Sequence, residues 1–229
     1  MEKEKMKEKK ENQESKMLEL FKPYVPEEVT SRILEGKGSL PSERREVTVI
    51  FLDINDFTYL SDRLDPKEAT DILNRIFQPI ISIVYKYEGS INKFLGDGLM
   101  IVFGTPYFRE NDPERAVRAS LEIIESIDKN GKIKIVNKLK NLKAMIGINT
   151  GFCISGDIGS SLRKEFTVIG DTVNLASRLQ VNAQPGEIVI GESTYQKVKE
   201  KFIFELPRKL KIKGKKDLVT AYKLKGIRK

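Results

Sequence analysis

The sequence predicts an α+β fold in which helices pack on an antiparallel sheet. Two observations lead to this prediction. Short apolar runs rich in β-branched residues, which are typical of strands, alternate with longer segments whose apolar residues recur at helical spacing. In chain order they give strand, helix, strand, strand, helix and strand, and then a further unit. That order is typical of a ferredoxin-like sandwich, with the helices on one face of the sheet.

The first three elements are clearly marked in the sequence. VTVIFLD, at 47–53, is an apolar run that ends in an acid, and it predicts a buried strand. A helical stretch is expected from about Thr58 to Tyr87, because its apolar residues follow the helical period. INKFLGDGLMIVFG, at 91–104, consists of two short apolar runs around Gly-Asp-Gly, which predicts a hairpin.

The second half of the chain continues the pattern. A helix is expected over 112–128, with Asp112 as its N-cap before a proline. The segments 143–151 and 152–159 are apolar enough to be strands. TVNLASRLQ, at 172–180, has the spacing of an amphipathic helix.

The N-terminal part of the chain differs in composition from the rest. Residues 1–16 are nearly all polar, which predicts a solvent-exposed helix. Pro26 and the two glutamates after it indicate a second helix, EEVTSRIL, which ends at one of the glycines that follow. We interpret 1–40 as a charged N-terminal segment with a linker helix, and 44–226 as one domain.

Composition points to a soluble globular chain. Of its 229 residues 39% are hydrophobic and 32% are charged, with both signs mixed. No apolar run approaches the roughly 20 residues that span a bilayer, and the N-terminus has no apolar core like that of a signal peptide. Cys153 is the only cysteine, so an intrachain disulfide is excluded. We expect a cytoplasmic protein, or a domain at the cytoplasmic face of a membrane within a larger receptor.

The chain contains no histidine, which narrows its possible chemistry. Ser-His and Cys-His nucleophiles are excluded, and a zinc site is disfavoured. Catalysis must use carboxylates, Lys, Arg and hard metal ions such as Mg²⁺. The net charge of +8 admits nucleic acid, an anionic membrane or a polyphosphate as partner. Much of it lies after 207, where basic and apolar residues alternate without interleaved aromatics, so nucleic acid is disfavoured.

Two acids are candidates for a metal site. Asp53 ends the first predicted strand, and Asp97 lies at the tip of the predicted hairpin. If these strands are neighbours, both carboxylates project from the same edge and repel each other unless cations lie between them. The alternative is that Asp97 is only a turn residue and Asp53 only ends a strand; spacing alone does not choose between these interpretations.

Other polar residues are weaker candidates for phosphate binding. The residues from Ile54 to Thr58 lead into a helix, where backbone N–H groups can hold a triphosphate, although Asp56 would repel phosphate unless its side chain points away. Asn174 and Arg178 are four apart and share a helix face, which can equally be a solvated polar face. Lys213, taken singly, is one lysine among many.

Five stretches together resemble the catalytic domain of the class III adenylyl and guanylyl cyclases. They occur in the family's order and cover most of 44–226: VTVIFLDINDFT, INKFLGDGLMIVFG, GINTGFCISGDIGS, TVIGDTVNLASRL and KIKGKKDLVTAYKL. The resemblance implies that two divalent metal ions, Mg²⁺ or Mn²⁺, help convert ATP into cyclic AMP and pyrophosphate. Rival interpretations are a guanylate cyclase and an inactive nucleotide-sensing dimerisation module.

The resemblance also assigns roles. Asp53 and Asp97, with the carbonyl of Ile54, look like the metal ligands. Beside them, Phe57 and Thr58 at the helix start remain the candidates for triphosphate binding through backbone N–H groups. On the other side of the substrate, Asn174 looks like the residue that orients the ribose. The remaining phosphate roles go to Arg178, for the α-phosphate, and Lys213, for the terminal phosphates.

Two further positions concern the base. Lys93 stands where the family's adenine-selecting lysine is found, whereas guanylyl cyclases usually have an acid there. Thr167 stands where many adenylyl cyclases have aspartate. Threonine is typical of a subgroup that includes the bicarbonate-responsive soluble cyclases, so bicarbonate is a possible effector.

The family divides each site between two subunits. Since this chain carries both sets of residues, the resemblance implies a homodimer. Asp56, in the phosphate loop, departs from the family's usual glycine, and Asn149 departs from a common histidine outside the catalytic set. LFKPYVPEEVTSRIL is similar to the linker that precedes this domain in multidomain cyclases, which implies an upstream sensor domain.

Overall fold

The protein is represented by a computed structural model that describes residues 15–17, 19–25, 29–30, 35, 42–105, 107–135 and 138–228. The helix predicted over 1–16 lies almost entirely outside these residues, and so does most of the helix predicted after Pro26. Near the start, residues 15–17 and 19–21 are helical and lead into a short 3-10 helix, η1 (Lys22–Tyr24). None of the described helices is long and apolar enough to cross a bilayer.

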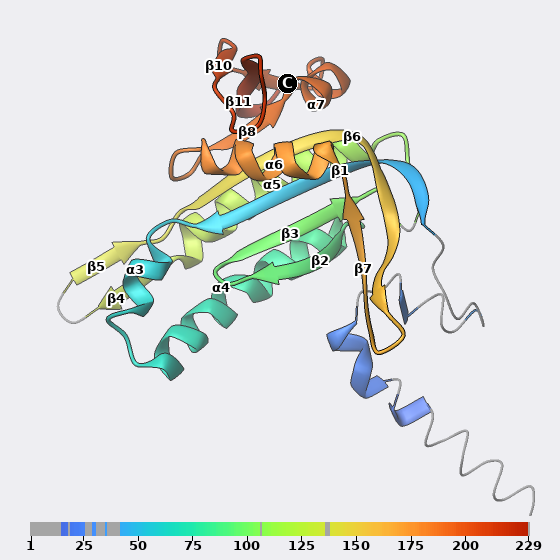
Figure 1. Cartoon of the computed structure of the whole chain (residues 1–229). Coiled ribbons are helices and arrows are strands. Elements are labelled where there is room, and N and C mark those ends of the chain that lie inside the picture. The colour runs from blue at the N-terminus through green and yellow to red at the C-terminus, as the bar shows by residue number, and fades with distance from the viewer. Residues whose placement is uncertain are drawn as a thin grey trace, which may run out of the picture.

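A ferredoxin-like unit forms the centre of the fold (Figure 1). Its strands lie in the order β6-β1-β3-β2, and every neighbouring pair among them is antiparallel. This confirms the predicted α+β class. In chain order the unit consists of β1 (Glu43–Ile54), α3 (Phe57–Ser61), α4 (Pro66–Lys86), β2 (Ser90–Leu95), β3 (Gly98–Phe103), α5 (Asp112–Asn130) and β6 (Ala144–Ser160).

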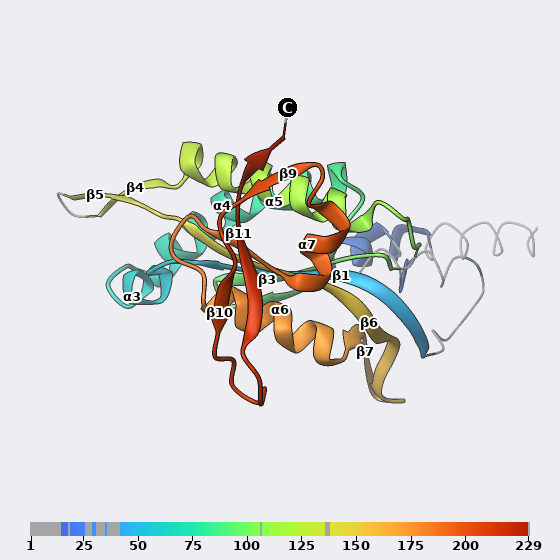
Figure 2. The same ribbon diagram turned by 90° about the horizontal axis from the view of Figure 1, so that it is seen from above.

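Further elements extend this unit at both ends. β8 pairs in parallel with β6, so the whole sheet is mixed rather than purely antiparallel, and the path continues to β11 and β10. β7 pairs with β6, β9 pairs with β11, and β4 and β5 form a separate hairpin that projects from the body (Figures 1 and 2). These elements are β4 (Lys132–Ile135), β5 (Lys138–Asn141), β7 (Arg163–Ile169), α6 (Asp171–Val181), β8 (Ile188–Gly191), α7 (Glu192–Val198), β9 (Phe202–Phe204), β10 (Arg208–Leu210) and β11 (Val219–Ile227).

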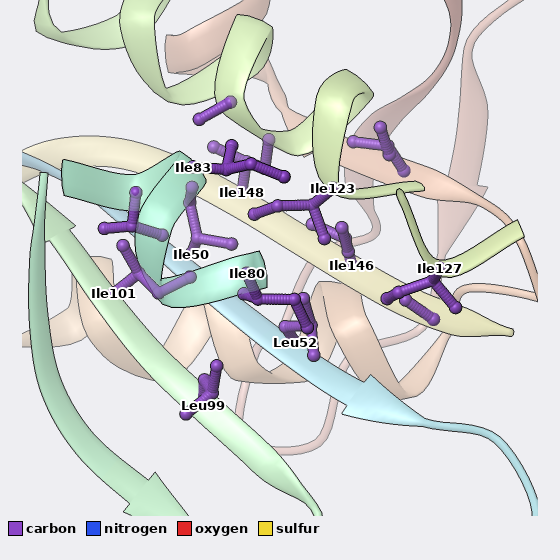
Figure 3. Packing of buried hydrophobic residues seen from close by; sticks show 14 of the residues in the cluster. Ile50, Leu52, Ile80, Ile83, Leu99, Ile101, Ile123, Ile127, Ile146 and Ile148 are labelled. Carbon is purple, nitrogen blue, oxygen red and sulfur yellow. The ribbon is translucent and has the colours of Figure 1, made fainter. Parts of the chain in front are cut away.

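Both faces of the central strands are buried. Alternate residues of β1, among them Ile50 and Leu52, join α4 and α5 in the main core (Figure 3). The other alternation, Val47 and Val49, packs with Ala176 of α6. Helices therefore cover both faces of the sheet, as Figure 2 shows, and not one face as the element order suggested. Burial on both sides explains why the middle of β1, residues 47–52, is almost entirely apolar.

α6 lies directly on β6 because of a glycine. A Cβ atom built on Gly147 would lie 2.2 Å from the backbone nitrogen of Gln180 and 2.3 Å from the carbonyl oxygen of Ala176. No side chain fits between these backbones, so any substitution would push the helix away from the sheet. The position of α6, which carries two candidate site residues, therefore depends on this close approach.

Three predicted boundaries differ from the structure. The helix expected from Thr58 to Tyr87 is divided into α3 and α4, because Asp65 caps a new helix by accepting a hydrogen bond from the Lys67 backbone N–H at 2.9 Å. The N-cap of α5 is Asn111; Asp112 is the first helical residue, and its buried carboxylate pairs with Arg115. The two strands expected over 143–159 are one strand, β6.

Candidate active site

The two candidate metal ligands lie together at one edge of the sheet. Asp53 lies opposite Gly98 in the β1–β3 register, and Asp97 is the turn residue immediately before that glycine. The Thr58 hydroxyl, at the start of α3, donates a hydrogen bond of 3.2 Å to Oδ2 of Asp97. The antiparallel pairing of β1 and β3 thus produces the juxtaposition of acids that the strand order predicts.

This pair of acids is electrostatically uncompensated. Burial of Asp53, followed by the negative charge of Asp97, raises the pKa of Asp53 to about 6. In the described part of the chain, neither acid forms an ion pair with a lysine or arginine. Two carboxylates without a cation suit a hard divalent ion, so their chemistry fits the metals that the resemblance implies.

Main-chain and substrate atoms would have to complete such a metal site. Ile54 has a hydrocarbon side chain that is buried in the core, and only its backbone carbonyl has an atom that can ligate a metal ion. Within the described ranges, no group of three or more Asp, Glu, Cys or His side chains is placed to hold an ion. Phe57 is also buried in the core, whereas Thr58 is exposed, so a triphosphate contact at Phe57 would fall to its backbone N–H.

The structure shows how Asp56 is accommodated beside this loop. Its backbone is left-handed, with φ of 61°, a conformation that glycine adopts more readily. Its carboxylate pairs with the Lys140 ammonium of β5 at 3.0 Å. Lys140 also lies over the Tyr59 ring, with its ammonium 5.6 Å from the ring centroid. The acid that was expected to repel phosphate is therefore neutralised from the projecting hairpin.

The two candidate base-reading residues lie on strands that side chains join. β7 pairs in the sheet with β6 and not with β2. Nevertheless, Lys93 of β2 forms an ion pair with Glu165 of β7. The Thr167 hydroxyl of β7 donates to Oδ1 of Asn92 at 3.0 Å. Asn92 and Glu165 were not singled out from the sequence, where their only signal is proximity to Lys93 and Thr167.

The candidate phosphate-binding residues also come together. Asn174 is exposed and Arg178 half-buried, one turn apart on α6. Gly214, next to the exposed Lys213, lies against Arg178, since a Cβ atom built on it would be 3.4 Å from both terminal guanidinium nitrogens. Lys215 pairs with Asp171 at 2.6 Å and holds this loop to the start of α6. Lys213, inconspicuous in the sequence, thus immediately precedes the glycine that lies against Arg178.

Comparisons with known proteins agree with this architecture. Residues 41–226 match the family described as adenylate and guanylate cyclase catalytic domain. The chain belongs to this family. The solved adenylyl cyclase CyaB from P. aeruginosa is similar in structure, with a TM-score of 0.77 and 33% identity over 83% of this chain and 98% of that chain. The guanylyl cyclase Cya2 gives a TM-score of 0.76 and 29% identity, covering 82% and 95%.

Among curated proteins, adenylate cyclase 1 of Rhizobium meliloti (strain 1021) is 29% identical over 211 residues. That match covers 90% of this chain but 32% of the relative, so the chain spans about a third of its length. Similarity extends to adenylyl and guanylyl cyclases alike. The comparisons therefore identify a cyclase catalytic domain and confirm the predicted family and fold.

In the cyclase domain the acids and the phosphate-binding candidates form two separate groups. In the described part of the chain, no hydrogen bond or ion pair joins Asp53 or Asp97 to Arg178 or Lys213. Asn149, the other departure from the family pattern, is buried and donates to the carbonyl of Thr172 at 3.2 Å. This hydrogen bond joins β6 to the first turn of α6.

Proposed function

We propose that this cyclase domain is an adenylate cyclase, a phosphorus–oxygen lyase that converts ATP into 3′,5′-cyclic AMP and pyrophosphate. The observation that carries this proposal is the junction of β2 and β7, where adjacent side-chain contacts between the two strands involve Lys93 and Thr167. An ammonium only donates hydrogen bonds, which suits N1 of adenine, an acceptor, and not N1–H of guanine. A hydroxyl can accept from the adenine amino group.

The metal half of the site comprises Asp53, Asp97 and the carbonyl of Ile54, which would hold two divalent cations, Mg²⁺ or Mn²⁺. When bound, these ions lower the pKa of the ribose 3′-hydroxyl and neutralise the triphosphate and the leaving pyrophosphate. The raised pKa of Asp53, which burial and the Asp97 charge cause, supports this assignment, because no protein cation offsets the two acids among the described residues.

The remaining residues would bind and orient the nucleotide. Asn174 would orient the ribose, and the Arg178 fork would stabilise charge that develops on the α-phosphate. Lys213 would hold the terminal phosphates, and the backbone N–H groups of Phe57 and Thr58 would meet the triphosphate. Since the chain has no histidine, the 3′-hydroxyl proton leaves to a carboxylate, to water or to the substrate itself.

We also propose that two copies of the chain share each site. The acids and the phosphate-binding group are not bonded to each other within one chain, among the residues described. In addition, one face of β6 exposes apolar side chains at alternate positions, Phe152 and Ile154, while Cys153 between them is buried. Ile154 lies opposite Ile169 of β7, which is also exposed. A second copy of the chain would cover this apolar surface.

The direct test is to incubate the purified protein with Mg²⁺ or Mn²⁺ and with ATP or GTP, and to identify the product. Cyclic AMP from ATP, formed in preference to cyclic GMP from GTP, supports the proposal. The similarity to Cya2 makes guanylate cyclase the second candidate, and preferential formation of cyclic GMP would establish it. If neither nucleotide gives a product, the remaining interpretation is an inactive nucleotide-sensing module. A bicarbonate response and an upstream sensor domain stay predictions.

Mixing two inactive variants tests the shared site. Asp53→Ala and Arg178→Ala homodimers should each be nearly inactive. In a mixed dimer both lesions fall in one site, and the other site is intact. Random mixing gives about half mixed dimers, so activity should recover toward roughly a quarter of wild type per chain. If the mixture stays inactive while subunit exchange is demonstrated independently, Asp53 and Arg178 serve the same chain's site.

A further inference from the structure

Asn92 occupies an irregular position in the edge strand β2. Along the β2–β3 pairing, Ile91 lies opposite Ile101 and Lys93 lies opposite Met100, so Asn92 is skipped. An extra residue of this kind is a β-bulge, which re-aims the side chains beside it. The bulge directs the Asn92 amide across to β7, where it contacts two consecutive residues.

The orientation of the Asn92 amide follows from its partners. Its Nδ2 atom donates to the backbone carbonyl of Phe166 at 3.3 Å. A carbonyl can only accept, so the NH₂ end must face Phe166 and the oxygen end must face Thr167. That oxygen can also only accept. The Thr167 hydroxyl must therefore donate its one proton to Asn92, over the 3.0 Å that separates the oxygen atoms.

The hydroxyl of Thr167 is consequently left with lone pairs alone. In the described part of the chain, its one side-chain hydrogen bond is to Asn92. Thr167 is only 6% exposed, so little water is available to compensate for a mismatched partner. A ligand that meets this hydroxyl must bring a donor.

We propose that Asn92 is a positioning residue for base selection: it fixes the Thr167 hydroxyl as an acceptor and thereby favours adenine over guanine. The 6-position of adenine carries an amino donor, whereas guanine has a 6-oxo acceptor that would face the same lone pairs. This inference rests on the proposed function, in which Thr167 reads the base. Asn92 itself acts through Thr167 and does not contact the nucleotide.

The junction also holds the other base-reading residue. Lys93 follows Asn92 in β2, and its ammonium pairs with Glu165, two residues before Thr167 in β7. Each of the two specificity residues, Lys93 and Thr167, therefore takes part in a side-chain contact between β2 and β7. Removing the Asn92 amide would free the Thr167 hydroxyl to rotate and donate, which would make it acceptable to the guanine oxygen.

The test is to measure kcat/KM for ATP and for GTP in wild type and in two variants. Asn92→Leu removes the acceptor for the Thr167 proton, so the ATP-to-GTP preference should fall by about tenfold, the effect of one buried hydrogen bond. Asn92→Asp is the control that keeps an acceptor: it loses the donor to the Phe166 carbonyl but still accepts the Thr167 proton, so the preference should persist even if overall rates change. In a Thr167→Val background, Asn92→Leu should cause no further change in preference.

The outcomes separate this inference from the proposed function. If Asn92→Leu lowers kcat/KM equally for both nucleotides, Asn92 only supports the fold and the inference is wrong. The preference can also be measured as binding alone, by comparing how well ATP and GTP displace a bound fluorescent ATP analogue. A wild type that forms no cyclic nucleotide, or that prefers GTP, would overturn the proposed function. Even then, a shift in binding toward GTP in Asn92→Leu supports the role of Asn92, and an unchanged ratio refutes it.

Discussion

Two groups of carboxylates in this molecule have pKa values shifted in opposite directions. At the end of β1, burial and then the charge of Asp97 raise the pKa of Asp53 to about 6. At the junction of β8, β10 and β11, Glu187 is also buried. Burial there opposes ionisation, but hydrogen bonds from Arg208, Lys223 and a backbone amide outweigh it and lower the pKa of Glu187 to about 2.

The difference lies in the cations that the fold supplies. Glu187 pairs with Arg208 at 3.1 Å and with Lys223 at 2.7 Å, and neighbouring Glu205 pairs with the same two residues and with Lys225. The chain carries 41 lysines and arginines against 33 acids, so cations are abundant. A half-buried pair of acids without a cation costs stability, and this cost is expected where a metal ion, and not a side chain, provides the positive charge.

The largest expected effect comes from removing one of the uncompensated acids. Asp97→Asn should lower cyclase activity by roughly a hundredfold or more, because the proposed metal site loses one of its two carboxylates. With a chelator present, its melting temperature should equal or exceed that of wild type, since the repulsion with Asp53 is relieved. Mn²⁺ should raise the melting temperature of wild type and not of Asp97→Asn.

Asp71→Asn, on an exposed part of α4, is the matched control and should change neither activity nor the response to Mn²⁺. If Asp97→Asn were destabilised with the chelator present, the acid would be a structural residue like Glu187. The contrast between the two groups would then disappear.

A smaller effect, on stability alone, is expected at the compensated group. Because the pKa of Glu187 is depressed, its ionised form stabilises the fold above its ordinary pKa of about 4.5, and this stability is lost as pH falls through about 2. Glu187→Gln should therefore lower the free energy of unfolding by about 2 to 3 kcal/mol at pH 7. Denaturant unfolding at several pH values should show this difference shrinking between pH 4.5 and 2.

Glu187→Gln should keep its cyclase activity at temperatures where the variant is folded, because Glu187 is not one of the proposed site residues. Glu200→Gln, at an exposed position, is the control and should leave the free energy of unfolding nearly unchanged. A stability difference that is constant from pH 7 to pH 2 would mean that Glu187 stabilises the fold by packing and not by its charge.

The sequence could predict the uncompensated acids because their placement is local. Asp53 ends a strand, Asp97 lies in a hairpin turn, and the order of elements makes those strands neighbours. The face of α6 that carries Asn174 and Arg178 follows equally from helical spacing. Such features depend on the spacing of residues within an element and on the order of the elements, and both can be deduced from the sequence.

The compensating contacts could not be predicted in this way. Asn92 meets Thr167 across 75 positions, and Asn92 is the residue of β2 that is skipped in the pairing with β3. Likewise, Lys140 reaches Asp56 from a hairpin that was not predicted, since its alternating lysines and aliphatic residues lack a typical turn pair. Side-chain partners from distant segments depend on bulges and packing, which leave no periodic signal.

The smallest expected effect concerns Asp56. This acid follows closely after Asp53 in the chain, but unlike Asp53 it forms an ion pair, with Lys140. Lys140→Gln should leave the Asp56 charge free to repel the triphosphate. KM for ATP should then rise by roughly fivefold, the equivalent of about 1 kcal/mol for a partly exposed ion pair. The effect should fall mainly on KM, because neither residue is among those proposed to act on the reacting atoms, and added salt should reduce it.

A double-mutant cycle decides whether neutralisation of Asp56 is the reason. Asp56→Gly removes the charge and suits the left-handed backbone at φ of 61°, so this variant should be active and at least as stable as wild type. In that background, Lys140→Gln should no longer change KM. Lys132→Gln, on the partner strand of the same hairpin, controls for the general loss of positive charge and should have little effect in either background. If Lys140→Gln raises KM equally with and without Asp56, Lys140 acts on the nucleotide directly. The hairpin would then be a phosphate-binding element and not a counter-charge for Asp56.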